Sequence, residues 1–189
     1  LKGDVVPEEV VEMLTPSKNA MGVEGADRPG HFAGVATVVD RLFTLVKPSV
    51  AYFGLKDYQQ VAVIKNMSAQ LHPVIAIRAC DTVREADGLA MSSRNRFLSQ
   101  SGRKSAALLN VALKKAVSLW NDGKSQAQEL IESVTDDISS DSAIDVQYIS
   151  IVRNGTMDQV QAVSENDVII AAIIVDGVRL IDNMSFANA

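Results

Sequence analysis

A strand–helix–strand pattern in the first half of the chain most constrains how it can fold. A short apolar run at residues 50–53 reads as a buried strand, and a helical pattern then continues to Leu71. A second apolar run follows at residues 74–77. Strands joined by one helix in this way pair in parallel, with a right-handed crossover. The sequence therefore predicts a βαβ unit, in which only two parallel strands are evident.

The turn between the first strand and its helix carries residues suited to an anionic ligand. Gly54, Lys56 and Asp57 follow the strand, and Gln59 and Gln60 come just inside the helix. Open α/β sheets bind ligands beyond the carboxyl ends of their strands, and helix N-termini favour anions. Gly54 would let a ligand approach the backbone, and Lys56 offers a mobile charge. A solvated turn with Asp57 as an ordinary N-cap is the competing interpretation.

A polar stretch at residues 81–96 separates this unit from the second half of the chain. Within it, Ser92, Ser93 and Arg94 form a compact set of anion donors. The arginine can fork onto two oxygens, while hydroxyls and backbone amides fill the remaining positions. A charged linker between two domains explains the same composition, and the residues alone leave both interpretations open.

Patterns elsewhere predict four further helices and a small sheet. An apolar face recurs along residues 31–46, with Val35, Val38 and Val39 among its members, and a weaker helical pattern spans residues 4–14. In the second half, helices are predicted over residues 99–121 and 126–140, followed by a strand at 146–153. Asp176-Gly177 between two apolar runs predicts a hairpin with a type I′ turn. The fold class is therefore α/β followed by a smaller α+β part, with the boundary near Thr82.

Composition excludes several classes of function. The net charge of −5 does not favour a general nucleic-acid surface, and no apolar run reaches membrane-spanning length. Cys80 is the single cysteine, so no internal disulfide can form, and its place after an apolar run predicts a buried side chain. The two histidines, His31 and His72, are too few and too far apart for a usual zinc site.

Three stretches of the chain resemble one enzyme family. They are HFAGVATVV at residues 31–39, YFGLKDYQQ at 52–60 and TVREADGLAMSSRN at 82–95, and LIDN at 180–183 adds to them. They resemble the C-terminal two-thirds of pantothenate synthetases (pantoate–β-alanine ligases). The resemblance implies part of a Rossmann-like nucleotidyltransferase domain over residues 1–82 and a smaller α+β domain over residues 83–189, with two helices and an antiparallel sheet.

The resemblance also implies a reaction and a set of site residues. Pantoate would attack the α-phosphorus of ATP to give pantoyl adenylate and pyrophosphate, and β-alanine would then displace AMP, with Mg²⁺ as cofactor. Lys56 and Arg94 are the implied catalytic residues, Gln60 would bind pantoate, and His31 is a weak candidate for a supporting role. No residue is implied as a metal ligand. The implied contacts to ATP are Gly54, Leu55, Lys56, Asp57, Val83, Met91, Ser92, Ser93 and Arg94.

The family further implies a cytoplasmic homodimer whose partners are small molecules, without nucleic acid or membrane. Its first nucleotide-binding motif, a His-x-Gly-His-type turn, has no counterpart in this sequence. We therefore expect the chain to correspond to a C-terminal piece that is inactive alone. Two alternatives stay open. One is another nucleotidyltransferase, such as a class I aminoacyl-tRNA synthetase, and the other is a non-catalytic domain for nucleotide binding or oligomerisation.

Overall fold

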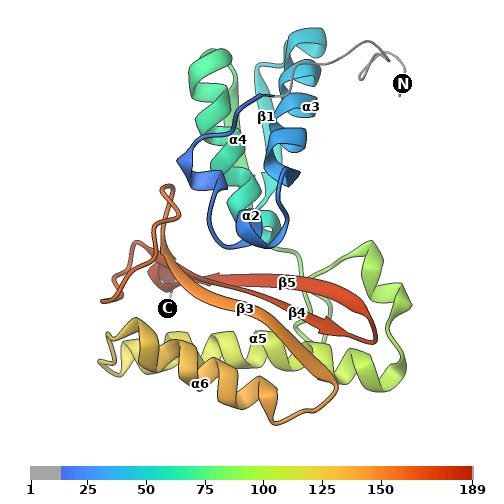
Figure 1. Cartoon of the computed structure of the whole chain (residues 1–189), viewed down its shortest axis with the longest axis vertical. Helices are drawn as coiled ribbons and strands as arrows, with labels where there is room; N and C mark the ends of the chain where they lie inside the picture. The colour runs from blue at the N-terminus through green and yellow to red at the C-terminus, as the bar shows by residue number, and fades with distance from the viewer. Residues whose placement is uncertain (1–13, 189) are drawn as a thin grey trace. The chain divides into compact units, whose positions relative to one another are not determined.

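The structure, a computed structural model, describes residues 14–188 of the chain. The helix predicted over residues 4–14 lies outside the described residues except for Leu14. The chain divides into two compact units, one formed by Leu1–Asp81 with Gly155–Met157 and the other by Thr82–Asn154 with Asp158–Ala189 (Figure 1). Each unit has its own hydrophobic core.

The first unit is built on the predicted βαβ pattern. Strand β1 (Val50–Gly54) pairs in parallel with β2 (Ala76–Cys80), with Val50 opposite Ala76 and Gly54 opposite Cys80. Between them, a 3-10 turn η2 (Leu55–Asp57) leads into α4 (Tyr58–Leu71), and α4 packs against α3 (His31–Val46). The buried side chains of this core come from both helices, from residue 20 and from the residue before β2: Ala20, Phe32, Ala36, Phe43, Val63, Ile64, Met67 and Ile75.

Three details of the first unit differ from the prediction. The second strand begins at Ala76, two residues late, because a turn closed by Ile75 N donating to His72 O at 3.0 Å precedes it. Val74 lies in that turn and is 88% exposed. Cys80 is exposed rather than buried, since it stands at the end of a strand whose side chains are mostly exposed. Residues 21–30 are rich in glycine and charge, which predicts a loop, but they contain a short helix, α2 (Glu24–Asp27), preceded by a 3-10 turn η1 (Lys18–Ala20).

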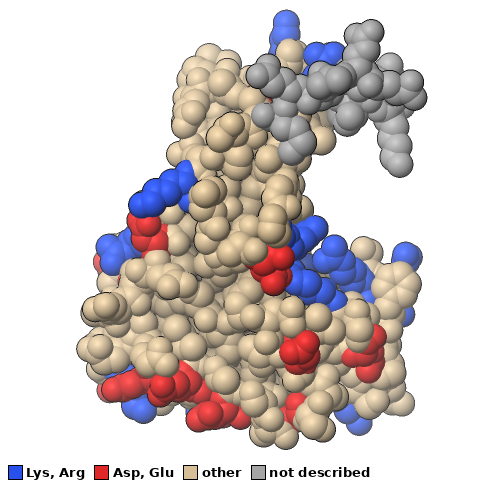
Figure 2. All heavy atoms as spheres, viewed as in Figure 1, with Lys and Arg blue, Asp and Glu red and all other residues tan. Residues whose placement is uncertain are grey.

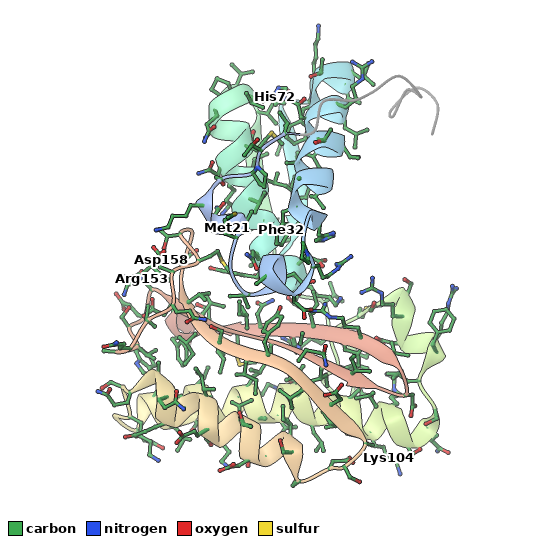
Figure 3. All side chains as sticks on the ribbon, viewed as in Figure 1. Met21, Phe32, His72, Lys104, Arg153 and Asp158 are labelled. Atoms are coloured by element: carbon green, nitrogen blue, oxygen red, sulfur yellow. The ribbon has the colours of Figure 1, made fainter. Side chains whose placement is uncertain are left out.

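Apolar side chains lie on two faces of helix α3, and the core of this unit buries one of these faces. Phe32, Ala36 and Phe43 are buried, whereas Val38 and Val46 are exposed. The C-terminal half of α3 is tied to the end of α4, where His72 Nε2 lies 2.7 Å from Asp40 Oδ1 and the His72 ring meets Phe43 edge-on (Figure 3). Half of the predicted apolar face is therefore exposed on this unit.

The second unit is the predicted α+β arrangement. Helices α5 (Gln100–Asn121) and α6 (Ala127–Ser139) cover the same face of a sheet in the order β3-β4-β5 (Figure 1). Strands β3 (Ile144–Arg153), β4 (Asp167–Val175) and β5 (Val178–Ser185) are antiparallel. A 3-10 turn η3 (Ser93–Phe97) precedes α5, and η4 (Phe186–Asn188) follows β5. Buried leucine, alanine and valine residues of both helices share one core with the alternate β4 residues Ile169, Ala171, Ile173 and Val175.

The tip of the β4–β5 hairpin caps the start of α5. Asp176 and Gly177 have φ values of 53° and 73°, as a type I′ turn requires. The Asp176 carboxylate accepts hydrogen bonds from the backbone N and the Oγ of Ser99, both at 2.8 Å. Gly102 leaves room for this contact, because a Cβ there would lie 1.9 Å from Asp176 Oδ2. The hairpin therefore helps to fix where α5 begins.

The charged residues of α6 lie on its outer side. Glu129, Glu132, Asp136 and Asp137 belong to this helix, and Figure 2 shows acidic side chains gathered along it. Its buried residues are apolar, so the acids form a solvated face. Within residues 14–188, no helix combines the length and apolarity needed to cross a membrane.

Candidate functional site

The structure places the Gly54–Asp57 segment at the carboxyl end of β1. Gly54 ends the strand in an extended conformation with φ −74°, and nothing lies within 4 Å of where its Cβ would stand. The fold itself therefore does not require glycine at this position, and an incoming group has open access to the backbone. Lys56 is half-buried in the 3-10 turn and Asp57 is exposed. Asp57 occupies the N-cap position of α4, but its side chain makes no capping hydrogen bond, contrary to the prediction.

Gln60 faces an open hollow of about 520 Å³ on the first unit. Its wall is mostly apolar and comes from the first half of α3 and the residue before it. The lining residues are Gly30, His31, Gly34, Val35, Val38, Val39 and Gln60. The structure therefore brings the predicted pantoate residue Gln60 together with His31. It also assigns the three valines, predicted as part of a core-facing helix, to the wall of this hollow.

The neighbouring Gln59 has a different role, which sequence analysis missed. Its side chain is buried. Its Nε2 donates to the carbonyls of Asn19 and Gly22 at 2.9 and 2.8 Å, and its Oε1 accepts from Glu24 N at 3.1 Å. The amide thus fastens the segment before α3 onto the start of α4.

Arg28 links this N-terminal segment to the rim of the hollow. Its Nη1 lies 3.3 Å from Glu24 Oε1 and also 3.3 Å from Nε2 of His31. A guanidinium can only donate, so in this contact Nε2 of His31 is the acceptor. The segment fastened by Gln59 therefore also orients one wall residue of the hollow.

The predicted ATP residues of the polar stretch gather in the second unit. Met91 N donates to Val83 O at 2.9 Å, so these two residues lie side by side. Both side chains are exposed. Ser92 precedes the turn η3, and its Oγ accepts from Arg94 N at 3.2 Å. Ser93 and Arg94 are exposed in that turn. The structure thus brings Val83 and Met91–Arg94 together, while Gly54–Asp57 and Gln60 form a separate group in the first unit.

The turn is supported by ionic contacts that no local pattern indicated. Arg103 of α5 donates to Glu85 Oε2, and its Nε donates to Asp87 Oδ2 at 2.8 Å. Hydrogen bonds from Arg103 and then from Asn95 lower the pKa of Glu85. Desolvation acts to raise the pKa of Asp87, but hydrogen bonds from Leu89 N and Arg103 outweigh it and lower the pKa. Both carboxylates are therefore ionised at neutral pH.

A second ionic contact ties the same stretch to the sheet. Arg84 Nη1 and Nη2 donate to the two oxygens of Asp182 on β5 at 2.7 and 2.9 Å, and Nη1 also donates to Gly88 O at 3.1 Å. Glu85, Asp87 and Asp182 are thus each paired with an arginine. Across residues 14–188, no three His, Cys, Asp or Glu side chains gather where they could hold a metal ion.

Comparison with known proteins places these residues in one family. The family model described as pantoate-beta-alanine ligase matches residues 4–185. Pantothenate synthetase of Heliobacterium modesticaldum is 44% identical over 174 residues, which are 92% of this chain and 60% of that protein. The crystal structure of pantothenate synthetase from Thermus thermophilus matches with a TM-score of 0.92 at 36% identity, over 98% of this chain and 67% of that one.

A third relative was solved with ligands. The crystal structure of pantoate-beta-alanine ligase from Francisella tularensis, complexed with beta-gamma ATP and beta-alanine, matches with a TM-score of 0.73 at 30% identity. The match covers the whole of this chain and 63% of the Francisella tularensis chain. The chain therefore spans between 60% and 67% of the length of these three relatives.

Proposed function

Because the chain belongs to the pantoate-beta-alanine ligase family, we propose that it binds ATP and pantoate and contributes to the ATP-driven ligation of pantoate with β-alanine. In the first step, a carboxylate oxygen of pantoate forms a bond to the α-phosphorus of ATP and pyrophosphate leaves. In the second, the amine of β-alanine attacks the acyl carbon of pantoyl adenylate, AMP leaves, and the amine loses a proton. The protein's task is to align the groups and to stabilise phosphate charge.

The observation that carries this proposal is the hollow lined by three valines, His31 and Gln60. Pantoate has two methyl groups on one quaternary carbon, flanked by hydroxyls and a carboxylate. The branched centre suits the wall of Val35, Val38 and Val39, and the Gln60 amide can bond a hydroxyl or the carboxylate. A mostly apolar hollow with one amide should bind such a ligand in preference to a fully polar one.

We assign ATP to the two groups of residues described above. Gly54 and Leu55 would offer backbone, Asp57 would offer a carboxylate, and Lys56 would lie near phosphate and the pantoate carboxylate. The open space above Gly54 supports this assignment, because the fold leaves that space unused. In the second unit, Val83 and Met91 would face the adenosine, while Ser92, Ser93 and Arg94 would hold the triphosphate.

The described residues do not fit a magnesium site built by the protein, since residues 14–188 contain no cluster of acidic ligands. We therefore propose that Mg²⁺ enters the site bound to the phosphates of ATP, as their counter-ion. The homodimer and the cytoplasmic location remain predictions of the family resemblance. Light scattering would test the first, by separating one copy of the 20.3 kDa chain from two.

Pantoate binding can be tested on the chain with methyl NMR. We expect pantoate to shift the methyl signals of Val35, Val38 and Val39, and we expect Gln60→Leu to weaken binding. Gln70→Leu is the matched control, because Gln70 lies on the same helix but is exposed. Shifts confined to other residues, or equal affinities of the two variants, would contradict the assignment.

Pantoate-dependent exchange between ATP and pyrophosphate tests the chemistry. In the longer protein that the family resemblance implies, we expect Lys56→Ala to lower this exchange strongly, because the substitution removes a partner of phosphate and carboxylate. Arg94→Ala should harm pyrophosphate formation more than attack by β-alanine, and equal damage to both steps would argue against its assignment. Binding of ATP and pantoate without exchange would support the alternative of a nucleotide-binding domain without activity of its own.

A further inference from the structure

We propose that Glu85 is a positioning residue for the turn that carries Ser92, Ser93 and Arg94. It acts through Asn95, with Arg103 of α5 as its fixed counter-charge. The inference rests on the proposed function, since it takes that turn to be the site for the phosphates of ATP. Its own content is that the anion donors are held by a chain of side chains that begins at the buried Asn95 and continues through the partly exposed Glu85 and Arg103.

Asn95 is the buried residue of the turn. It is 5% exposed, whereas its neighbours Arg94 and Arg96 are exposed. Its side-chain Nδ2 donates to Glu85 Oε1 at 2.6 Å and to Ala90 O at 3.1 Å. Its backbone N donates to Ser92 O at 3.1 Å. One side chain thus joins the turn to the strand-like segment on which the turn rests.

Glu85 continues this link to a long helix. Its second oxygen accepts from Arg103, which lies in the first turn of the 22-residue helix α5. Its backbone N also donates to Leu89 O at 2.9 Å, which closes the loop between them. The path from the anion donors to a rigid element therefore runs through Asn95, Glu85 and Arg103, with both oxygens of Glu85 engaged.

Only a carboxylate satisfies both partners at this position. Asn95 and Arg103 each present an N–H donor, so the residue between them must accept twice. Asn95 bonds Oε1 and Arg103 bonds Oε2, so the NH₂ group of a glutamine would stand at one of these two positions and face a donor, and Glu85→Gln would lose that contact. The ion pair with Arg103 also offsets a negative charge that would otherwise stand near bound phosphate.

These two effects of Glu85→Gln have opposite signs, which makes the proposal testable. Removing a negative charge near an anion site should strengthen anion binding if charge alone matters. Loosening the turn should weaken it. Asp87→Asn is the matched control, because Asp87 pairs with the same Arg103 and loses the same charge, yet its carboxylate bonds Leu89 N rather than the Asn95 amide. Its remaining carbonyl oxygen can still accept from Leu89 N, as Asp87 Oδ1 does at 3.1 Å.

Calorimetry with inorganic pyrophosphate and with ATP, on the 189-residue chain, measures the effect. We expect Glu85→Gln to weaken binding of both probes roughly tenfold, the effect of one lost hydrogen bond to a charged group. Asp87→Asn should bind as the wild-type chain does, or more tightly. Asn95→Ala removes the same link without touching Arg103 and should reproduce the loss. Binding by Glu85→Gln at or above the wild-type affinity would overturn the proposal.

Arg94→Ala separates failure of this inference from failure of the proposed function. If Arg94→Ala binds pyrophosphate as the wild-type chain does, or if the wild-type chain binds neither probe, the phosphate assignment itself is wrong. If Arg94→Ala weakens binding and Glu85→Gln does not, only the positioning role is wrong. Amide hydrogen exchange gives a readout without ligand: Glu85→Gln should speed exchange at Asn95 and Leu98, and Asp87→Asn should not. Equal exchange in the two variants would also overturn the positioning role.

Discussion

The Arg84–Asp182 pair offers the sharpest quantitative test of the second unit. The Asp182 side chain is 4% exposed and that of Arg84 is 23% exposed, so the carboxylate depends on the arginine for neutralisation. Arg84→Met keeps the length and the apolar stem of the side chain but removes the charge and both bonds to Asp182. The substitution therefore leaves a buried carboxylate with much less support.

The size of the effect follows from what remains. Leaving one member of a buried pair unpaired typically costs about 3–5 kcal/mol. Asp182 Oδ1 still accepts from Asn183 N at 2.8 Å, and the partly exposed arginine position admits water, so we expect the lower end of that range. Replacing both residues, as in Arg84→Met with Asp182→Leu, should cost less than Arg84→Met alone, because no charge is left unpaired.

Urea unfolding of the single and double variants completes a double-mutant cycle. We expect a coupling free energy of at least about 1.5 kcal/mol, well above the roughly 0.5 kcal/mol within which independent sites add. Lys115→Met is the control, since Lys115 and Asp137 are 52% and 34% exposed and such surface pairs contribute about 0–1 kcal/mol. Additive effects of Arg84→Met and Asp182→Leu would refute the reasoning.

Three further predictions follow from local geometry. Gly54→Ala should leave the melting temperature unchanged or slightly raised, because its φ is −74° and its Cβ meets open space, yet it should weaken ATP binding; unchanged affinity would argue against ligand approach at Gly54. Gly102→Ala should lower the melting temperature, because its Cβ would displace the Asp176 carboxylate from the start of α5, and a wild-type melting curve would contradict this. The Ser105 hydroxyl, 2.6 Å from Asp141, is the main cause of a lowered pKa of that carboxyl. Its stabilising effect is therefore present above the unfolded-state pKa and lost as pH falls through the folded-state pKa, so Ser105→Ala should destabilise the chain more at pH 7 than in strong acid, as urea unfolding at several pH values can measure.

The fold was largely predictable because periodicity and turn chemistry act locally. The βαβ unit, the two later helices and the hairpin at Asp176-Gly177 all appear where the patterns place them. The predictions of strand bounds and burial were wrong where an apolar residue type does not indicate whether the residue is buried. Val74 has a typical strand side chain but stands in a turn, and Val38 and Val46 share an apolar stripe without being covered. Whether an apolar stripe on a helix is buried depends on which elements pack against it, and the sequence of that helix alone does not determine this.

The sequence singles out the residues of the candidate site, whose roles stay predictions, but it does not indicate the contacts that support them. Motif spacing located Gly54–Gln60 and the turn near Arg94. The contact of Glu85 with Arg103 joins residues 18 positions apart, and that of Arg84 with Asp182 joins residues 98 apart, so neither has a local signature. Gln59 and Gln60 are the same residue type and are adjacent in the chain. Gln59 is buried and its side chain makes three hydrogen bonds, whereas Gln60 lines the hollow. A helical offset of one residue decides between these roles, and only the packed structure fixes it.

The ties between the polar stretch, α5 and β5 have a consequence for timescales. A free surface loop samples its conformations in nanoseconds to microseconds, whereas collective motion of a packed unit takes microseconds to milliseconds. Since Asn95, Glu85 and Arg103 fasten the turn to α5, and Arg84 fastens the same stretch to β5, Ser92–Arg94 should move only when that unit moves. Relaxation-dispersion signals from this turn should therefore share one exchange rate with those of α5, rather than report independent flapping.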